Sequence, residues 1–253
     1  MIHYHGTPIS GGEMSQLAFQ GKHACISFAA QESHEAIIEL SQSFMLDNGA
    51  FSAWMSGKEF DIEGFFQWVK IWHRHPGFDF YCMPDVIGGG EEENIRMRAT
   101  WFRMCQGTEI WDLGYPVWHL HEPLEVLSDF VSSCYPGVCF GSSGEYSEVG
   151  SKDWWVRMSE AMDVVTDDDG RPRARLHGLR MLDPTIFSHF PFKSADSTNV
   201  GRHAGSSERW KGAYVPTSTK MRALVMMDRI ESHASASRWT NTKGVTKNME
   251  LFG

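Results

Sequence analysis

The sequence Phe44-Met45-Leu46-Asp47-Asn48-Gly49-Ala50-Phe51 joins a short apolar run to an acid, an amide, a glycine and an aromatic residue. The apolar run is typical of a buried strand, so the polar residues come where that strand ends. There, Asp47 can take part in chemistry, Asn48 can read the edge of a flat heterocycle and Phe51 can stack on its face. An ordinary turn is the alternative, because Asp and Asn favour turns for local reasons.

Strand-like runs recur along the chain and alternate with segments of helical apolar spacing. The strand-like runs are Ile2–His5, Ala24–Phe28, Phe44–Leu46, Phe78–Cys82, Pro116–Leu120, Val138–Phe140, Leu176–Met181 and Phe190–Ala195. The helical segments are Gln31–Gln42, Ile62–Arg74, Glu91–Cys105, Leu124–Ser133, Asp153–Val165, Pro184–His189 and Lys220–Ser235. This alternation over 253 residues predicts an α/β protein with a single (β/α)8 barrel of the TIM type, and a doubly wound open sheet is the alternative. We expect the barrel core in residues 1–205 and a basic helical extension packed on it in residues 206–253.

Charge is spread unevenly over the chain. The net charge is −9, but residues 190–253 carry 10 Lys and Arg against 5 Asp and Glu. A basic C-terminal quarter can face phosphates, although charge patterning alone identifies no partner. The five cysteines include no CxxC pair, and no apolar stretch is long enough to cross a bilayer. Because the start also lacks the pattern of a signal peptide, we expect a cytoplasmic protein with free thiols and no membrane partner.

The carboxyl ends of the strands form the active site of a barrel of this type. The candidate residues there are Asp47, Asn48, Gly49, Phe51, Asp85, His119, Gly141, Ser142 and Asp196. Asp196 follows the eighth strand-like run as Asp47 follows the third. Two carboxylates at strand ends are what glycosyl chemistry needs.

Five of these segments, in chain order, resemble motifs of the tRNA-guanine transglycosylases. They also resemble the relatives of those enzymes that exchange guanine in DNA, the deazapurine DNA-modification transglycosylases of phages and bacterial islands. The segments are Asp47-Asn48-Gly49-Ala50-Phe51, Met83-Pro84-Asp85, Val117-Trp118-His119, Phe140-Gly141-Ser142-Ser143-Gly144-Glu145 and Ala195-Asp196-Ser197-Thr198-Asn199 with Arg202. The resemblance covers roughly residues 40–205, and His119 stands where the family has a base-reading glutamine.

The resemblance implies base exchange through a covalent intermediate. Asp196 would attack C1′ of a target deoxyguanosine, and Asp47 would move the proton to and from the bases. Asp85 and Asn48 would read the Watson–Crick edge, Phe51 would stack on the ring, and a 7-deazaguanine such as preQ0 would enter. Gly49, His119, Gly141 and Ser142 would complete the base pocket. No cofactor and no metal would be required.

The chain departs from the tRNA branch of the family in its C-terminal part. Those enzymes carry a zinc site of Cys-x-Cys-x-x-Cys and His, and this chain has no cysteine after Cys139. We therefore expect DNA as the polymer, with an RNA substrate as the alternative and a homodimer as an open question. The residues expected to contact DNA are Arg202, Arg209, Trp210 and Lys211.

Two other classes of protein fit parts of the pattern. The pairs His3-x-His5 and His119-x-His121, with Asp196, suggest a metal-dependent amidohydrolase, because alternate residues of a strand share a face. That interpretation leaves the Asp47 motif unused. The other class is an inactive nucleic-acid-binding barrel, against which the two intact carboxylates count.

Overall fold

The computed structural model describes residues 1–30, 34–133, 135–210 and 214–240. Nine strands form one sheet: β1 Ile2–Gly6, β2 His23–Ser27, β3 Ser43–Asp47, β4 Phe78–Cys82, β5 Gly114–Tyr115, β6 Val117–His119, β7 Gly137–Gly141, β8 Arg175–Gly178 and β9 Ser194–Ser197. Their order is β5-β4-β3-β2-β1-β9-β8-β7-β6, and each pair of neighbours is parallel. The sequence-based expectation of a mixed α/β fold is confirmed.

The sheet is nearly closed into a barrel by the segment that contains β5 and β6. These two strands stand at opposite ends of the sheet order, yet only Pro116 separates them in the sequence. β5 pairs with β4, and β6 pairs with β7. Proline has no N–H to donate, which interrupts the strand, but the Pro116 carbonyl still accepts a hydrogen bond from Cys139 N at 2.9 Å. The ladder therefore continues past the proline.

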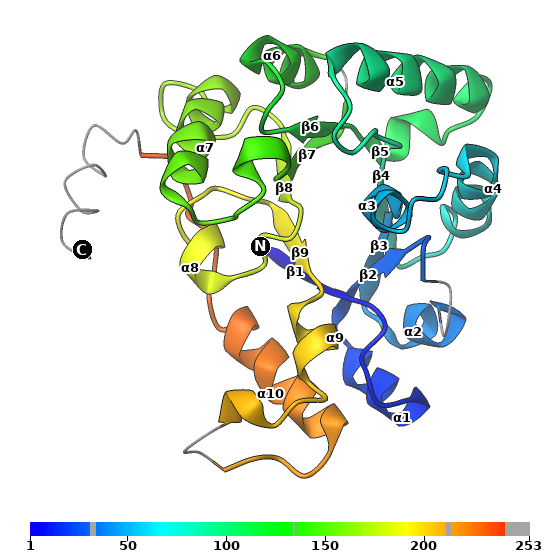
Figure 1. The fold of residues 1–253 in the computed structure, drawn as a ribbon, viewed down its shortest axis with the longest axis vertical. Helices are drawn as coiled ribbons and strands as arrows, with labels where there is room; N and C mark the ends of the chain where they lie inside the picture. Colours follow the sequence, from blue (N-terminus) through cyan, green and yellow to red (C-terminus); the bar gives the residue numbers. More distant parts are fainter. Residues whose placement is uncertain (31–33, 134, 211–213, 241–253) are drawn as a thin grey trace.

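Helices cover the outside of the strands (Figure 1). They are α1 Glu13–Gln16, α2 His34–Leu40, α3 Ala50–Met55, α4 Ile62–Trp72, α5 Glu91–Cys105, α6 Leu124–Ser132, α7 Lys152–Val165, α8 Pro184–Phe187, α9 Asn199–His203 and α10 Thr219–Glu231, with 3-10 turns η1 Leu17–Phe19, η2 Trp111–Leu113, η3 Gly144–Tyr146 and η4 Glu208–Trp210. Several begin at a polar side chain that accepts a backbone N–H, which offsets the unpaired donors of a first turn. Asp61 does so for α4, Ser151 for α7 and Ser218 for α10.

The two sides of the sheet have separate apolar cores. One lies between strands and helices and includes the fully buried Trp101, Trp154 and Phe187. The other fills the interior of the curved sheet with Tyr4, Cys25, Met45, Phe80, Cys82, Tyr115, Val117 and Cys139. There, the rings of Phe80 and Tyr115 stack at 4.0 Å. Because side chains fill this interior, a ligand has to bind at an end of the sheet rather than inside it.

Two strands, β8 and β9, differ most from the sequence-based prediction. The last strand is β9, Ser194–Ser197, instead of Phe190–Ala195, so Asp196 lies within the strand and not after it. Pro191 cannot donate to a ladder, and the Phe190 ring instead stacks on Trp155 at 5.3 Å. β8 ends at Gly178 instead of Met181, because Arg180 takes a left-handed conformation with φ 59°.

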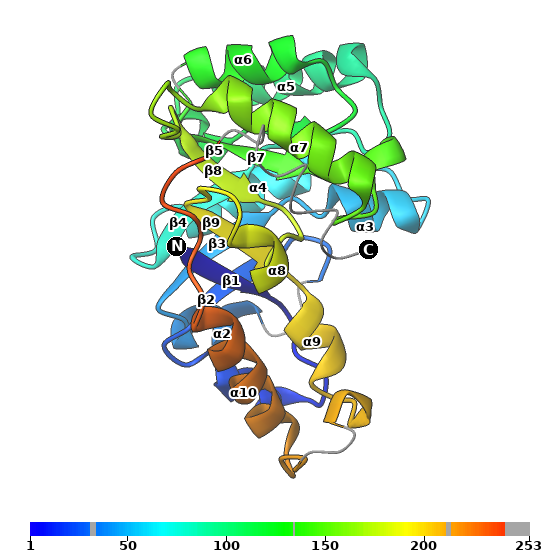
Figure 2. The same ribbon diagram turned by 90° about the vertical axis from the view of Figure 1, so that its left-hand side faces the viewer.

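The described part of the C-terminal segment packs on the strands through α10. Figure 2 shows α10 beside α9 at the lower end of the molecule. Glu231 of α10 lies 2.9 Å from His5 Nε2, and the Lys22 amine donates to it at 2.6 Å. Burial alone would raise the pKa of Glu231, but these two partners lower it to about 2. Among the described residues, no helix is both long and apolar enough to span a membrane.

Candidate active site

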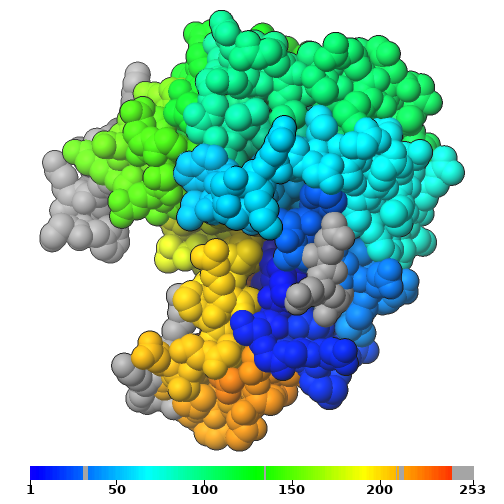
Figure 3. Space-filling model, turned by 45° about the vertical axis from the view of Figure 1, so that its right-hand side comes forward, coloured from blue at the N-terminus to red at the C-terminus, as the bar shows by residue number. Residues whose placement is uncertain are grey.

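Five polar residues that the sequence singled out gather at one end of the nearly closed sheet. Asp47 ends β3, His119 ends β6, Asp196 lies in β9, and Asp85 and Ser142 follow β4 and β7. Since the strands are parallel, their carboxyl ends meet at the same end of the sheet. The space-filling view shows a recess there, between residues near 50 in light blue and residues near 200 in yellow (Figure 3).

Asp47 is held by two donors at the end of β3. The Ser27 hydroxyl donates to Oδ2 at 2.9 Å, and the Gly49 amide donates to the same oxygen at 3.1 Å. Burial raises the pKa of Asp47 to about 7, and the charge of Asp196 adds to the shift. A carboxyl group with that pKa exists in both the protonated and the ionised form at neutral pH, as an acid–base group requires.

The residues after Asp47 form a tight connection into α3. Gly49 has φ 75°, and a Cβ there would lie 2.8 Å from the Ala29 nitrogen, so the position requires glycine. Asn48 Oδ1 accepts from the Ala50 amide at 2.8 Å at the start of the helix. The turn and the candidate site are thus the same structure, and the turn interpretation does not exclude the functional one.

Asn48 fixes the position of Asp85. Its Nδ2 donates to the Met83 carbonyl and to Asp85 Oδ1, both at 2.7 Å, and the side chain is 4% exposed. Both amide hydrogens of Asn48 are therefore used within the protein. In this state Asn48 positions Asp85 through Oδ1, and the other oxygen of Asp85, Oδ2, faces His119.

His119 faces Asp85 across the end of the sheet. Its Nε2 lies 2.8 Å from Asp85 Oδ2, and its Nδ1 lies 3.1 Å from the Ser143 hydroxyl, which also contacts His121 at 2.9 Å. Burial lowers the pKa of His119, but the Asp85 carboxylate outweighs it, and the pKa lies above the ordinary value. His119 is therefore a cation and a hydrogen-bond donor over a wider pH range than a free histidine.

Gly141 and Ser142 shape the site through their backbone. A Cβ on Gly141 would lie 3.0 Å from His119 Nδ1, so glycine leaves room for the imidazole. The Ser142 hydroxyl accepts from Trp154 Nε1 at 2.9 Å, toward the helix layer, whereas its carbonyl accepts from the Arg180 guanidinium. The expected contribution of Ser142 to a base pocket is thus limited here to its main chain.

Asp196 is buried in β9 and contacts two residues: His177 of β8 and Arg180, which follows β8. The Arg180 amide donates to Asp196 Oδ1 at 3.0 Å, and His177 Nε2 lies 3.3 Å from the same oxygen. His177 is fixed in turn by a 2.8 Å contact between its Nδ1 and the Ser194 hydroxyl. The side chain of Asp196 is only 9% exposed, so a reacting atom has to enter from the open end of the sheet.

His177 and Arg180 are site residues that the sequence analysis did not select. Both come from the run Leu176-His177-Gly178-Leu179-Arg180-Met181, which read as a strand with no polar end. The signal for His177 was a histidine within a strand-like run, one residue before Gly178, where β8 ends. No local pattern predicts the left-handed backbone of Arg180.

The histidine pairs do not form a shared metal site. His3 and His5 do share a face of β1, but this face is turned toward the helices, where His3 Nε2 contacts the His233 carbonyl at 3.0 Å and His5 contacts Glu231. The neighbouring Tyr4 points into the interior of the sheet instead. Over the described residues, no group of three or more His, Cys, Asp or Glu is arranged to hold a metal ion. This geometry opposes the amidohydrolase interpretation.

The residues expected to contact DNA are only partly described. Arg202 is exposed on α9. Trp210 is 5% exposed, and the Arg229 guanidinium lies 5.2 Å from its ring, so its expected role of stacking on an unpaired base does not fit this conformation. Tertiary packing of α10 against η4 is the reason. Lys211 and the side chain of Arg209 lie outside the described part of the chain.

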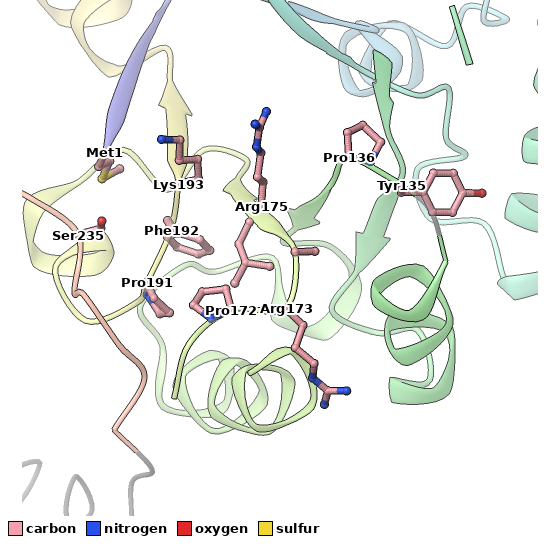
Figure 4. A pocket seen from close by; sticks show the side chains of 12 residues that line it. Met1, Tyr135, Pro136, Pro172, Arg173, Arg175, Pro191, Phe192, Lys193 and Ser235 are labelled. Atoms are coloured by element: carbon pink, nitrogen blue, oxygen red, sulfur yellow. The ribbon is translucent and has the colours of Figure 1, made fainter. Parts of the chain in front are cut away.

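Two pockets of about 610 Å³ lie at opposite ends of the strands. One adjoins the candidate site and is lined by residues that include Arg180, Ser197 and Asn199. The other lies at the amino ends of the strands, where Arg175 and Lys193 line it (Figure 4). The second pocket is remote from the carboxylates, so we do not assign it to the chemistry.

Comparisons of the chain with protein-family models, with curated proteins and with solved structures found no match. A function for the site therefore has to be inferred from its residues. The arrangement that any proposal must explain is a pair of coupled acids, Asp47 and Asp196, beside the buried pair Asp85 and His119.

Proposed function

We propose that this protein is a transglycosylase that exchanges guanine in DNA for a 7-deazaguanine base such as preQ0. The exchange would pass through a covalent aspartyl-deoxyribose intermediate on a (β/α)8 barrel in which β5 and β6 act as one strand. The observation that carries the proposal is that Asp47 and Asp196 lie at the same end of the sheet as the buried pair Asp85 and His119. Burial raises the pKa of Asp47 to about 7, and the charge of Asp196 adds to the shift.

The first half-reaction needs a nucleophile and an acid. The Asp196 carboxylate attacks C1′, the bond from C1′ to N9 of guanine breaks, and the leaving base takes the electron pair and the proton of Asp47. Asp47 has to be protonated at this stage, and its pKa of about 7 makes that form available at neutral pH.

The second half-reaction reverses these roles with a different base. The ionised Asp47 accepts the proton from N9 of the incoming 7-deazaguanine, N9 attacks C1′, and the bond to Asp196 breaks. The same carboxyl group thus serves as acid and then as base, and no group outside the site has to supply or remove a proton. The Arg180 amide and His177 hold Asp196 in place throughout.

Base selection would fall to Asp85 and His119. A carboxylate accepts from the N1–H and N2–H donors of guanine, and a protonated histidine donates to O6. Asn48 and Ser143 position these two side chains, which face each other at 2.8 Å in the free protein, so the base has to enter between them to contact both. The raised pKa of His119 supplies the donor that a glutamine amide supplies in the enzymes this sequence resembles.

The experiment is incorporation of labelled guanine, and then labelled preQ0, into matched DNA and tRNA substrates at one salt concentration. Exchange into DNA is the expected result. Label in tRNA with none in DNA would mean that tRNA is the substrate instead of DNA, while the proposed exchange reaction would remain. Absence of label from both, with intact binding of nucleic acid, would favour an inactive binding barrel and reject the proposal.

A further inference from the structure

Arg180 crosses the open end of the nearly closed sheet. It follows β8, and β8 is separated from β3 by β2, β1 and β9 along the sheet order, so the two strands face each other across the barrel. Nevertheless, the Arg180 guanidinium carbon lies 4.6 Å from the ring centroid of Phe51, which belongs to α3 directly after β3. The side chain therefore spans the open end of the sheet, in front of the carboxylates of Asp47 and Asp196.

Three contacts hold Arg180 in this position. Its amide donates to Asp196 at 3.0 Å, its guanidinium donates to the Ser142 carbonyl, and the same group rests on Phe51. The backbone of Arg180 has φ 59°, a left-handed conformation that is unfavourable for a residue with a side chain. This backbone conformation directs the side chain across the open end of the sheet and the amide toward Asp196, the proposed nucleophile.

A base cannot stack on this face of Phe51 while Arg180 stays there. Stacked atoms prefer separations of about 3.5–4 Å, so a base between the ring and the guanidinium needs about 7 Å. The observed 4.6 Å leaves no room for it. The guanidinium has to leave Phe51 when the base enters, and it then needs another partner.

Arg202 marks where that partner lies. Arg202 belongs to α9, which follows β9; β9 pairs with β8, and Arg180 lines the same pocket as Asn199, the first residue of α9. Burial lowers the pKa of Arg180, and Arg202, as a like charge, also lowers it. Among the residues that the structure describes, neither arginine forms an ion pair with a carboxylate. A phosphate can accept from both guanidinium groups, because neither is already taken up by an ion pair in the described part of the chain.

We propose that the side chain of Arg180 moves between two positions. In the free protein it covers the Phe51 ring and closes the open end of the sheet. When the target nucleotide enters, Arg180 leaves Phe51, the base stacks there instead, and Arg180 and Arg202 together bind the phosphate of that nucleotide. The proposal rests on the proposed function for the identity of the nucleotide. It makes Arg180 a positioning residue that links recognition of the polymer to opening of the site.

The test separates binding of the polymer from binding of the free base. Binding of a short single-stranded deoxyoligonucleotide is measured at several salt concentrations for the wild type, Arg180→Ala, Arg180→Lys and the control Arg96→Ala. Arg96 is an exposed arginine on α5, paired with Glu92, and its loss removes the same charge away from the open end of the sheet. Binding of free guanine and preQ0 is measured calorimetrically on the same proteins.

Arg180→Ala is expected to weaken oligonucleotide binding about tenfold and to lower the salt slope by about 0.7, the value for one phosphate contact on a single strand. Arg180→Lys should keep the slope, and Arg96→Ala should keep both affinity and slope. Binding of free guanine to Arg180→Ala should be unchanged or tighter, because nothing has to leave Phe51. Arg180→Gly, which suits the left-handed backbone, repeats the test if the alanine variant folds poorly.

Three results would contradict this proposal. The first is wild-type affinity and salt slope in Arg180→Ala and Arg180→Gly, and the second is no oligonucleotide binding by the wild type. The third is a loss of free guanine binding above tenfold with oligonucleotide binding retained, which would make Arg180 a direct base reader. If the phosphate contact is found but the wild type exchanges no base, the two positions of Arg180 are supported and the transglycosylase proposal fails.

Discussion

Oδ2 of Asp85 lies 2.8 Å from Nε2 of His119, and both side chains are almost completely buried at the end of the sheet where Asp47 and Asp196 also lie. An acceptor and a donor are thus fixed side by side. This is the pattern that the N1–H and O6 of guanine require. In the proposed function, this pair would let a histidine serve where the enzymes that this sequence resembles have a glutamine.

The first prediction concerns His119. His119→Ala should weaken binding of free guanine about 10–100-fold, because a hydrogen bond to a charged group contributes about 1.5–3 kcal/mol. His119→Gln should recover most of that loss. In the wild type, guanine affinity should fall as the pH rises through the raised pKa of His119, and this dependence should be absent from the glutamine variant. Calorimetric titration from pH 6 to pH 9 checks both, and equal affinities in all three proteins would remove His119 from base recognition.

The second prediction concerns the activity of Asp47. Because the group has to act as an acid and then as a base, exchange should be fastest near pH 7 and decline on either side. Asp47→Asn should lower the exchange rate about 10²–10⁴-fold and weaken base binding much less. A pH–rate profile for both proteins is the measurement. A variant that loses only base affinity would contradict the proton-transfer role.

The same carboxyl group should affect stability in a defined direction. Its pKa of about 7 in the folded protein lies above that of an unfolded aspartate, so the stabilisation present at low pH is lost as the pH rises through about 7. Asp47→Asn should therefore be more stable than the wild type at pH 8, by on the order of 2 kcal/mol, and close to it at pH 4. Urea unfolding at the two pH values provides the comparison, and a gap that shrinks at pH 8 would contradict the raised pKa.

The third prediction tests the connection that carries the site. Gly49→Ala adds a Cβ 2.8 Å from the Ala29 nitrogen at a positive φ, and it should destabilise the fold by about 2–4 kcal/mol. Gly57→Ala is the matched control, because Gly57 also has a positive φ but nothing within 4 Å of an added Cβ. The control should cost about 1 kcal/mol, from backbone strain alone. Equal losses in urea unfolding would show that close packing at Gly49 contributes nothing.

Much of the fold follows from patterns that the sequence makes visible. The prediction gave the bounds of β4 and α5 as the structure has them, because both have a clear periodicity and clear ends. β9 was displaced because the apolar run Phe190–Lys193 packs against Trp155 and Trp239 instead of joining the ladder. Such a contact between distant segments cannot be read from spacing along the chain.

The site was predictable where polar residues end a strand, and hidden where tertiary geometry decides. The sequence predicted that Asp47, Asp85, His119 and Asp196 lie at one end of the sheet, because each follows or ends an apolar run. Arg180 was missed because its left-handed backbone is set by packing and not by its residue type. Trp210 was placed wrongly at a nucleic-acid surface because its burial depends on α10, which follows it in the chain.

The covalent role of Asp196 is the central claim, and trapping the intermediate tests it most directly. The wild-type protein is mixed with an oligodeoxynucleotide containing guanine, denatured after seconds and analysed by intact mass. We predict a species whose mass is that of the protein plus the oligonucleotide less one guanine, with the link on Asp196, and none in Asp196→Ala or Asp196→Asn, both of which should fold and be inactive. Exchange by either variant above about a hundredth of the wild-type rate, or a covalent link at another residue, would contradict the account.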